Sequence, residues 1–288
     1  MFAREESQYG LAYSEAFDEF KAALNEGRIR AAEPDPSSPT GWKVNAWVKK
    51  GILLGFRIGR IVEMPLKFKI VRTIGTGRPA VTESEHQTQF RDKHTYPLKK
   101  IPPERNVRVV PGGSSIRDGC YIGKGVVCMP PMYVNVGSYV DDGALIDSHA
   151  LVGSCAQIGK RVHLSAGAQI GGVLEPVGAL PVVLEDEVLV GGNCGVYEGT
   201  VVKRRAVLGT GTILNRSIPV YDLIRDAVYT ATDSDPLVIP EQAIVVPGSR
   251  AVSHAAGAKW GLSLQAAVIV KYRDAKTDAR VQLEDLLR

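Results

Sequence analysis

Aliphatic residues recur at every sixth position through the middle of this chain of 288 residues. The series runs from Ile116 to Ile170 and resumes from Leu184 to Leu214. All sixteen members are apolar and all but Cys128 are aliphatic. They are Ile116, Ile122, Cys128, Val134, Val140, Ile146, Val152, Ile158, Leu164, Ile170, Leu184, Val190, Val196, Val202, Leu208 and Leu214. A period of six matches neither the two-residue alternation of a half-buried strand nor the 3.6-residue period of a helix. The chain therefore needs an architecture whose repeating unit is six residues long.

Repeats of six residues are typical of the parallel β-helix. Each hexapeptide forms one flat side, three sides close a triangular coil of about 18 residues, and the aliphatic side chains stack inward from coil to coil. The residue directly after each aliphatic position is often Gly, Asn or Asp, which we interpret as a corner that requires positive φ. Known hexapeptide solenoids wind left-handed, so resemblance to them implies a left-handed coil. The sequence predicts a mainly β protein with a left-handed parallel β-helix over residues 109–220.

The six-residue register breaks between Ile170 and Leu184. The intervening GGVLEPVGALPVV (171–183) contains two prolines and three glycines. We therefore predict a loop near 173–183 that leaves the coil. Long loops on a rigid scaffold often carry function.

The flanking residues predict an N-terminal helical domain over 1–108 and a C-terminal region over 221–288. In the first, a helix over 13–27 is expected to bury Phe17, Phe20 and Leu24 and to end at Gly27. A linker is predicted over 33–41 and a second helix over 42–56. In the C-terminal region, we expect a coil, a strand over 264–272 and a capping helix over 281–288.

Composition narrows the class of protein. With 44% hydrophobic and 23% charged residues, the chain is typical of a globular protein. We find no apolar run that spans a membrane and no secretion signal, so we expect a cytoplasmic protein. A net charge of +4 without a dense basic cluster argues against nucleic-acid binding. Without a CxxC pair, the cysteines are expected to be free thiols.

Three segments resemble a known family: WVKKGILLGFR (47–57), YVDDGALIDSHALVGSCAQIGKRVHLSAGAQIGGVLEP (139–176) and AAVIVKYRDAKT (266–277). They are similar to the tetrahydrodipicolinate N-succinyltransferases of lysine and diaminopimelate biosynthesis. The resemblance implies a homotrimer of left-handed β-helices with active sites in the grooves between subunits. It also implies transfer of a succinyl group from succinyl-CoA to the amine of ring-opened tetrahydrodipicolinate, a dicarboxylic amino acid, without a metal or a permanently bound cofactor.

The resemblance assigns two acceptor contacts, Arg108 in VRVVP and Asp147 in LIDSHA. A guanidinium group pairs bidentately with a carboxylate, and an aspartate can orient an amine and take its proton. The alternatives are a surface arginine and a structural corner aspartate, which is the role we expect for Asp141. Glu198 in VYEG is a further substrate-binding candidate, and Glu175 in the predicted loop is a weaker one.

One position departs from the family pattern. Where the family has a glutamate in a segment like RSEVVEG, this chain reads NCGVYEG, with Gly195 in the place of the glutamate. In the family, that glutamate contacts the acceptor amine from the adjacent subunit. Either Asp147 suffices here, Glu198 or a water substitutes, or the acceptor differs. Gly195 also precedes the inward Val196, so it can be a simple corner glycine.

The phosphates of coenzyme A favour basic side chains and free backbone amides. We therefore expect Ser249 and Arg250 in VVPGSRAV, and Lys203 in the basic run 203–205, to bind the donor.

Three alternative functions stay open from the sequence. The donor can be acetyl-CoA instead of succinyl-CoA. A γ-type carbonic anhydrase uses the same solenoid, but it needs three zinc-binding histidines, and only His149 and His163 lie in the regular coils. A non-enzymatic trimeric scaffold is the third alternative, because the fold does not determine the function.

Overall fold

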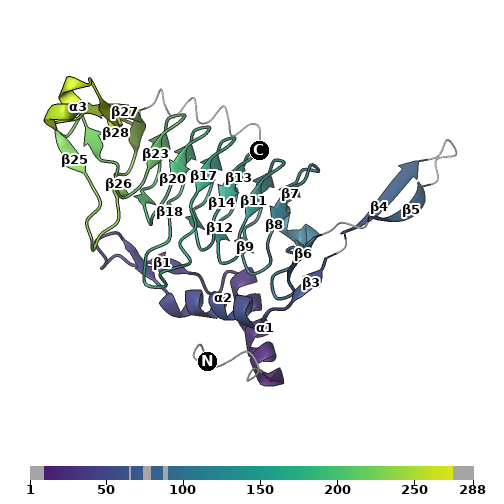
Figure 1. Ribbon diagram of the computed structural model, residues 1–288. Coiled ribbons are helices and arrows are strands. Elements are labelled where there is room, and N and C mark those ends of the chain that lie inside the picture. Colours follow the sequence, from purple (N-terminus) through teal and green to yellow (C-terminus); the bar gives the residue numbers. More distant parts are fainter. Residues whose placement is uncertain (1–9, 65, 74–78, 87–89, 275–288) are drawn as a thin grey trace.

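The computed structural model describes residues 10–64, 66–73, 79–86 and 90–274. A long stack of short parallel strands forms its body, with the helices of the N-terminal region along one side and a cap at the C-terminal end (Figure 1). The fold is the parallel β-helix of hexapeptide repeats that the sequence predicts.

Three parallel ladders form the sides of the coil. The first side consists of β7 (Arg108–Val109), β10 (Val127–Cys128), β13 (Leu145–Ile146), β16 (His163–Leu164), β19 (Leu189–Val190), β22 (Val207–Leu208) and the start of β27 (Ala243–Ala251). The second side consists of β8 (Ser115–Ile116), β11 (Tyr133–Val134), β14 (Leu151–Val152), β17 (Gln169–Ile170), β20 (Gly195–Val196) and β23 (Ile213–Leu214). The third side consists of β9 (Tyr121–Ile122), β12 (Tyr139–Val140), β15 (Gln157–Ile158), β18 (Val183–Leu184), β21 (Val201–Val202) and β26 (Val238–Ile239).

The segments between the sides form three rows of turns. Corner A joins the first side to the second, at 129–132, 147–150, 165–168, 191–194 and 209–212. Corner B joins the second side to the third, at 117–120, 135–138, 153–156, 171–182 and 197–200. Corner C joins the third side to the first, at 123–126, 141–144, 159–162, 185–188 and 203–206.

The predicted core is confirmed at every position of the six-residue series. None of the sixteen side chains is more than 6% exposed, and all belong to one continuous cluster. Ladder pairing places each one on its counterpart in the next coil, as with Ile146 on Leu164. Burying one such side chain stabilises the fold by about 1.5–3 kcal/mol, so the stack is the main source of rigidity.

The expectation about the corners is wrong in its detail. Positive φ occurs three residues after the inward aliphatic residue, as at Gly143 (φ 68°), His149 (61°) and Cys155 (67°), and not directly after it. Glycine directly after the aliphatic residue has another cause. A Cβ at Gly153 would lie 2.2 Å from the backbone nitrogen of Gly172 in the next coil, so that position requires close approach between coils.

Two helices form in the N-terminal region, as predicted. Helix α1 (Leu11–Asn25) buries Phe17 and Leu24, and Gly27 follows it with φ of 73°. Helix α2 (Ala46–Ile58) begins four residues later than predicted. The reason is that β1 (Ala32–Pro34) and β2 (Trp42–Val44) pair as an antiparallel hairpin. The predicted linker over 33–41 is therefore wrong.

The N-terminal region also contains strands that the helical prediction omits. Strand β3 (Ile61–Glu63) pairs with β6 (Arg91–Lys93), and β4 (Leu66–Thr73) pairs with β5 (Pro79–His86) in a hairpin that projects away from the coil (Figure 1). A short 3-10 helix, η2 (Pro103–Arg105), precedes the first coil.

The C-terminal cap continues the first side. Strand β28 (Ser263–Tyr272) confirms the predicted strand, and it pairs with β27 and with β24 (Val220–Asp222), which also pairs with β25 (Ala227–Tyr229). Helix α3 (Ala255–Lys259) connects β27 to β28. The predicted helix over 281–288 lies outside the described residues. The domain boundaries near 108 and 220 stay predictions, and parallel stacking continues past residue 220 through β26 and β27.

The cysteines are free, as predicted, and all four are buried. They are Cys120, Cys128, Cys155 and Cys194. Burial raises the pKa of Cys120, Cys128 and Cys155 to about 12, so these thiols stay protonated and unreactive at neutral pH. Within the described ranges, no helix has the length and apolar character needed to cross a membrane.

Candidate active site

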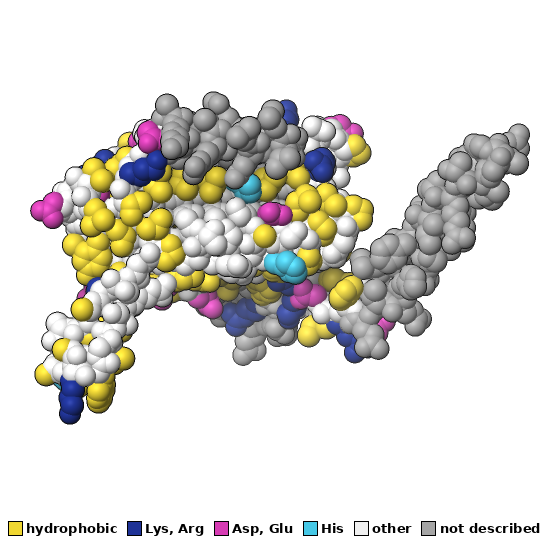
Figure 2. Space-filling model, turned by 90° about the horizontal axis from the view of Figure 1, so that it is seen from above, with side chains coloured by type: hydrophobic (Ala, Val, Ile, Leu, Met, Phe, Trp, Pro, Cys, Tyr) yellow, Lys and Arg dark blue, Asp and Glu magenta, His cyan; other side chains and the backbone are white. Residues whose placement is uncertain are grey.

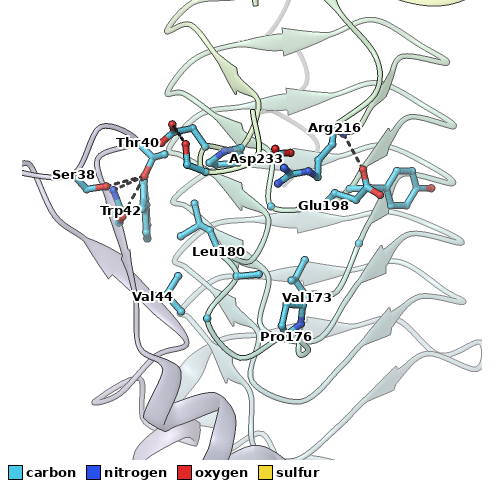
Figure 3. A pocket seen from close by; sticks show the side chains of 18 of the residues that line it. Ser38, Thr40, Trp42, Val44, Val173, Pro176, Leu180, Glu198, Arg216 and Asp233 are labelled. Atoms are coloured by element: carbon cyan, nitrogen blue, oxygen red, sulfur yellow. Dashed lines mark hydrogen bonds between the residues drawn. The ribbon is translucent and has the colours of Figure 1, made fainter. Parts of the chain in front are cut away.

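A cleft of about 830 Å³ opens beside corner B. The hairpin β1–β2 contributes Thr40, Trp42 and Val44 on one side (Figure 3). Glu198 and Arg216 face them from the opposite side, with the loop 171–182 between the two. The loop is the ejected segment predicted from the break in the repeat, since regular strands end at Ile170 and resume at Val183.

Lys203 holds the hairpin wall of this cleft. Its Nζ donates to the backbone oxygen of Thr40 at 2.6 Å and to Oε1 of Glu185 at 2.8 Å. The same carboxylate oxygen accepts from Nε1 of Trp42 at 3.0 Å. The ammonium group predicted to bind coenzyme A therefore already joins the hairpin to corner C.

Lys49 of α2 anchors the loop 171–182 through a hydrogen bond. Its side chain is fully buried on α2, and its Nζ donates to the backbone oxygen of Ala179 at 2.5 Å. Burial lowers the pKa of Lys49. Among the described residues no carboxylate pairs with it. Burying a cation without a counter-charge costs free energy, and the hydrogen bond from Lys49 to the loop offsets part of that cost.

The lining of the cleft is acidic. Glu198 is exposed and its Oε2 accepts from the backbone nitrogen of Arg216 at 2.9 Å. Glu175, Asp233 and Asp235 also line the cleft. A phosphate would be repelled by these carboxylates, whereas an amine or a neutral amide would not. The cleft suits the amine-bearing or neutral part of a ligand.

Arg108 and Asp147 lie outside the cleft, along the first side. Arg108 is exposed and stands in register with Val127 and Leu145, two strand spacings away, or about 10 Å. Asp147 follows β13 at corner A and is half-buried. Its Oδ1 accepts from the backbone nitrogen of Ser148 at 2.7 Å, and its Oδ2 has no partner in the described part of the chain.

Asp141 makes the same local contact at corner C. Its Oδ1 accepts from the backbone nitrogen of Asp142 at 2.8 Å. The cap alone therefore does not distinguish Asp147 from a structural aspartate. Their positions do, because they lie on different corners of the coil.

Ser249 and Arg250 lie on β27, opposite Gln265 and Leu264 of β28. Ser249 is exposed. Nε of Arg250 is buried and has no hydrogen-bond partner among the residues that the structure describes. Its Nε–H is therefore a donor that no described residue uses.

One chain does not bring the predicted site residues together. Glu175 and Glu198 line the cleft at corner B, whereas Arg108, Asp147 and the pair on β27 lie elsewhere. Sequence analysis did not identify Trp42, Tyr197 or Arg216, which the cleft includes. These residues follow no period, and their proximity arises from contacts between distant segments.

The two histidines of the coils lie apart from the cleft. His149 is exposed at corner A, and His163 precedes the inward Leu164 in β16. Across residues 10–64, 66–73, 79–86 and 90–274, no group of three His, Cys, Asp or Glu side chains is placed to hold a metal ion.

Residues 3–58 match the family model described as the N-terminal domain of tetrahydrodipicolinate N-succinyltransferase. The 2,3,4,5-tetrahydropyridine-2,6-dicarboxylate N-succinyltransferase of Bradyrhizobium diazoefficiens is 37% identical over 281 residues, which cover 95% of this chain and 89% of that protein. The protein of the same name from Aromatoleum aromaticum is 43% identical over 271 residues, covering 93% and 86%. One from Herminiimonas arsenicoxydans is 41% identical with the same coverage. The chain therefore belongs to the tetrahydropyridine-dicarboxylate N-succinyltransferase family.

Proposed function

We propose that this protein transfers the succinyl group of succinyl-CoA to the amine of ring-opened tetrahydrodipicolinate, in lysine and diaminopimelate biosynthesis. The observation that carries the proposal is the similarity to succinyltransferases over more than nine-tenths of the chain, including coil, N-terminal region and cap. A cytoplasmic location suits an enzyme that uses a CoA thioester.

The reaction is an aminolysis of a thioester. The neutral amine nitrogen attacks the succinyl carbonyl carbon, and the tetrahedral oxyanion then collapses to break the carbon–sulfur bond. The proton lost by the amine ends on the sulfur of free coenzyme A. The protein must align the amine, accept its proton and stabilise the oxyanion.

Asp147 and Arg108 supply two of these functions in the proposal. The unpartnered Oδ2 of Asp147 is available to accept the amine proton. Arg108 stands two strands from Leu145, about 10 Å along the first side, and Asp147 follows the strand of Leu145, so the two residues suit opposite ends of an extended seven-carbon acceptor. Backbone amides at the corners provide donors for the oxyanion.

A second copy of the chain completes the site in this proposal. The candidate residues lie at separate corners and sides of one β-helix, and a groove between neighbouring chains can bring them together. The outward positions of the second side include Leu151 and Ile213, which are aliphatic. The surface over the coils is mostly hydrophobic or uncharged (Figure 2). Such a surface favours association, and supports the homotrimer that the family resemblance implies.

Coenzyme A is placed with its phosphates at Ser249 and Arg250. These residues lie away from the acidic cleft, and Arg250 has an unused donor. The pantetheine arm then runs along the coils towards Asp147.

A thiol-release assay tests the proposal. Purified protein is given succinyl-CoA or acetyl-CoA, each with and without tetrahydrodipicolinate, and the native mass is measured in the same buffer. We expect thiol release only with succinyl-CoA and acceptor together, from a species of three chains. Equal or greater rates with acetyl-CoA would overturn the donor assignment. No acceptor-dependent release with either donor would overturn the function.

A further inference from the structure

The ring of Tyr197 is seated on two glycines. A Cβ at Gly195 would lie 2.4 Å from Cε2 of Tyr197 and 2.8 Å from its hydroxyl oxygen. A Cβ at Gly171, in the coil below, would lie 2.7 Å from Cδ1 of the same ring. Side chains do not approach this closely, so the ring occupies its position only because both residues are glycine.

The seat fixes the direction of the phenol group. Tyr197 begins the corner B segment, but its hydroxyl end lies back over Gly195 on the second side. In the chain, Gly195 directly follows corner A, the corner that also carries Asp147. The hydroxyl is thus directed along the second side from the cleft towards corner A.

The hydroxyl is also unused. Tyr197 is half-buried and lines the cleft together with Gly171 and Glu198. Its backbone nitrogen donates to the oxygen of Leu214, and its backbone oxygen accepts from Thr200. Within the described residues its hydroxyl has no hydrogen-bond partner. A half-buried phenol normally finds a hydrogen-bond partner.

We infer that Tyr197 is an acceptor-contacting residue that helps to determine specificity, and that Gly171 and Gly195 are its positioning residues. This inference rests on the proposed function. The phenol O–H can donate to a carboxylate while its oxygen accepts from an amine, so it suits the amino-acid end of the acceptor. The carboxylates of the adjacent cleft, including that of Glu198, favour an amine and disfavour the phosphates of the donor.

The position of the Tyr197 ring explains why residue 195 is glycine. Any side chain at position 195 would displace the ring of Tyr197. The seated ring therefore requires glycine at this position. In this inference the acceptor is held by a hydrogen bond from the phenol.

Steady-state kinetics of Tyr197→Phe tests the contact, because phenylalanine keeps the ring on its seat. We expect the KM for the acceptor to rise about tenfold or more, as for loss of a hydrogen bond to a charged group, with the KM for succinyl-CoA within about twofold. Tyr221→Phe is the matched control, since Tyr221 lies in β24 outside the cleft, and should match the wild type.

A second variant pair tests the seat. Gly195→Ala should raise the acceptor KM by displacing the ring, and should have no further effect in a Tyr197→Val background, where no ring is present. Thermal unfolding of each variant verifies that it is folded. If Gly195→Ala acts equally in both backgrounds, the seat has no role.

The outcomes separate this inference from the function it rests on. An active wild type with an unchanged acceptor KM in Tyr197→Phe overturns only the role of Tyr197. A wild type without acceptor-dependent thiol release overturns the proposed function, and this inference with it.

Discussion

Corners A and B flank the same side of the coil and are built differently. From 129 to 212, every corner A segment has four residues. Corner B has the same short turns at 135–138, 153–156 and 197–200, but between them it ejects the loop 171–182. The cleft lies beside corner B, where this loop and the hairpin β1–β2 stand away from the coil.

One repetitive scaffold therefore supplies two kinds of structural feature, side chains in fixed positions and a cavity. A regular corner repeats at each coil and presents capped side chains and backbone amides in fixed positions, as with Asp147. An irregular corner creates volume, because there the chain leaves the surface of the β-helix. A site that needs both a fixed base and a cavity must join the two corners, and neighbouring copies of the coil can do so.

The largest expected effect comes from the regular corner. Asp147→Asn should lower kcat by at least tenfold, about 1.4 kcal/mol in activation free energy, because an amide cannot accept the amine proton. The cap to Ser148 is retained by the asparagine oxygen, so the native mass should be unchanged. Steady-state rates and the native mass measure these two results.

Asp141→Asn is the matched control, since it changes the same cap at corner C. Its kcat should stay within twofold of the wild type. Near-normal turnover in Asp147→Asn would remove this residue from the mechanism. Equal losses in both variants would show that the corner cap, and not the base, is being measured.

A smaller effect is expected at the irregular corner. Lys49→Met removes the hydrogen bond to Ala179 while keeping an apolar stem of similar length on α2. The loop then loses an anchor, and we expect the acceptor KM to rise about threefold and cleavage within 171–182 by a protease to accelerate. Lys50→Met is the control, because Lys50 is exposed on the same helix. Identical cleavage rates in the two variants would argue against the anchor.

The same variant has a pH signature. Burial lowers the pKa of Lys49 from 10.5, so between its folded and unfolded pKa values the unfolded chain binds more protons. The free energy of unfolding therefore rises with pH across that window, and the full cost of the buried charge applies below it. Relative to Lys49→Met, the wild type should gain stability as the pH approaches 10.5. If denaturant titrations show that the difference in free energy of unfolding between the two proteins does not change with pH, the cation is not desolvated.

The sequence predicts well what repeats locally. The inward series from Ile116 to Leu214 fixes the coil, because each aliphatic residue meets its own counterpart one coil away. The break after Ile170 locates the loop for the same reason. The role of the residue after each aliphatic position was misassigned, since period alone does not separate a positive φ from close approach between coils.

The candidate site was less predictable because it depends on non-periodic contacts. The three-residue strands of the β1–β2 hairpin carry no readable alternation, so Trp42 could not be placed in the cleft. The seat of Tyr197 requires Gly171 from a different coil, across the ejected loop. Arg108 and Asp147 came from family resemblance, and their shared side became visible only in the ladder pairing.

The smallest effect is expected for Lys203 at corner C. It decides whether this residue supports the hairpin or binds coenzyme A. Its Nζ joins Thr40 to Glu185 in a partly exposed position, so Lys203→Met should lower the free energy of unfolding by about 1 kcal/mol or less. Because two of its three N–H donors already bind Thr40 and Glu185, the KM for succinyl-CoA should change less than twofold. Arg250→Met, which removes an unused donor, should raise it more. If Lys203→Met instead raised the KM for succinyl-CoA more than Arg250→Met did, the coenzyme A contact would be assigned to corner C, nearer the cleft.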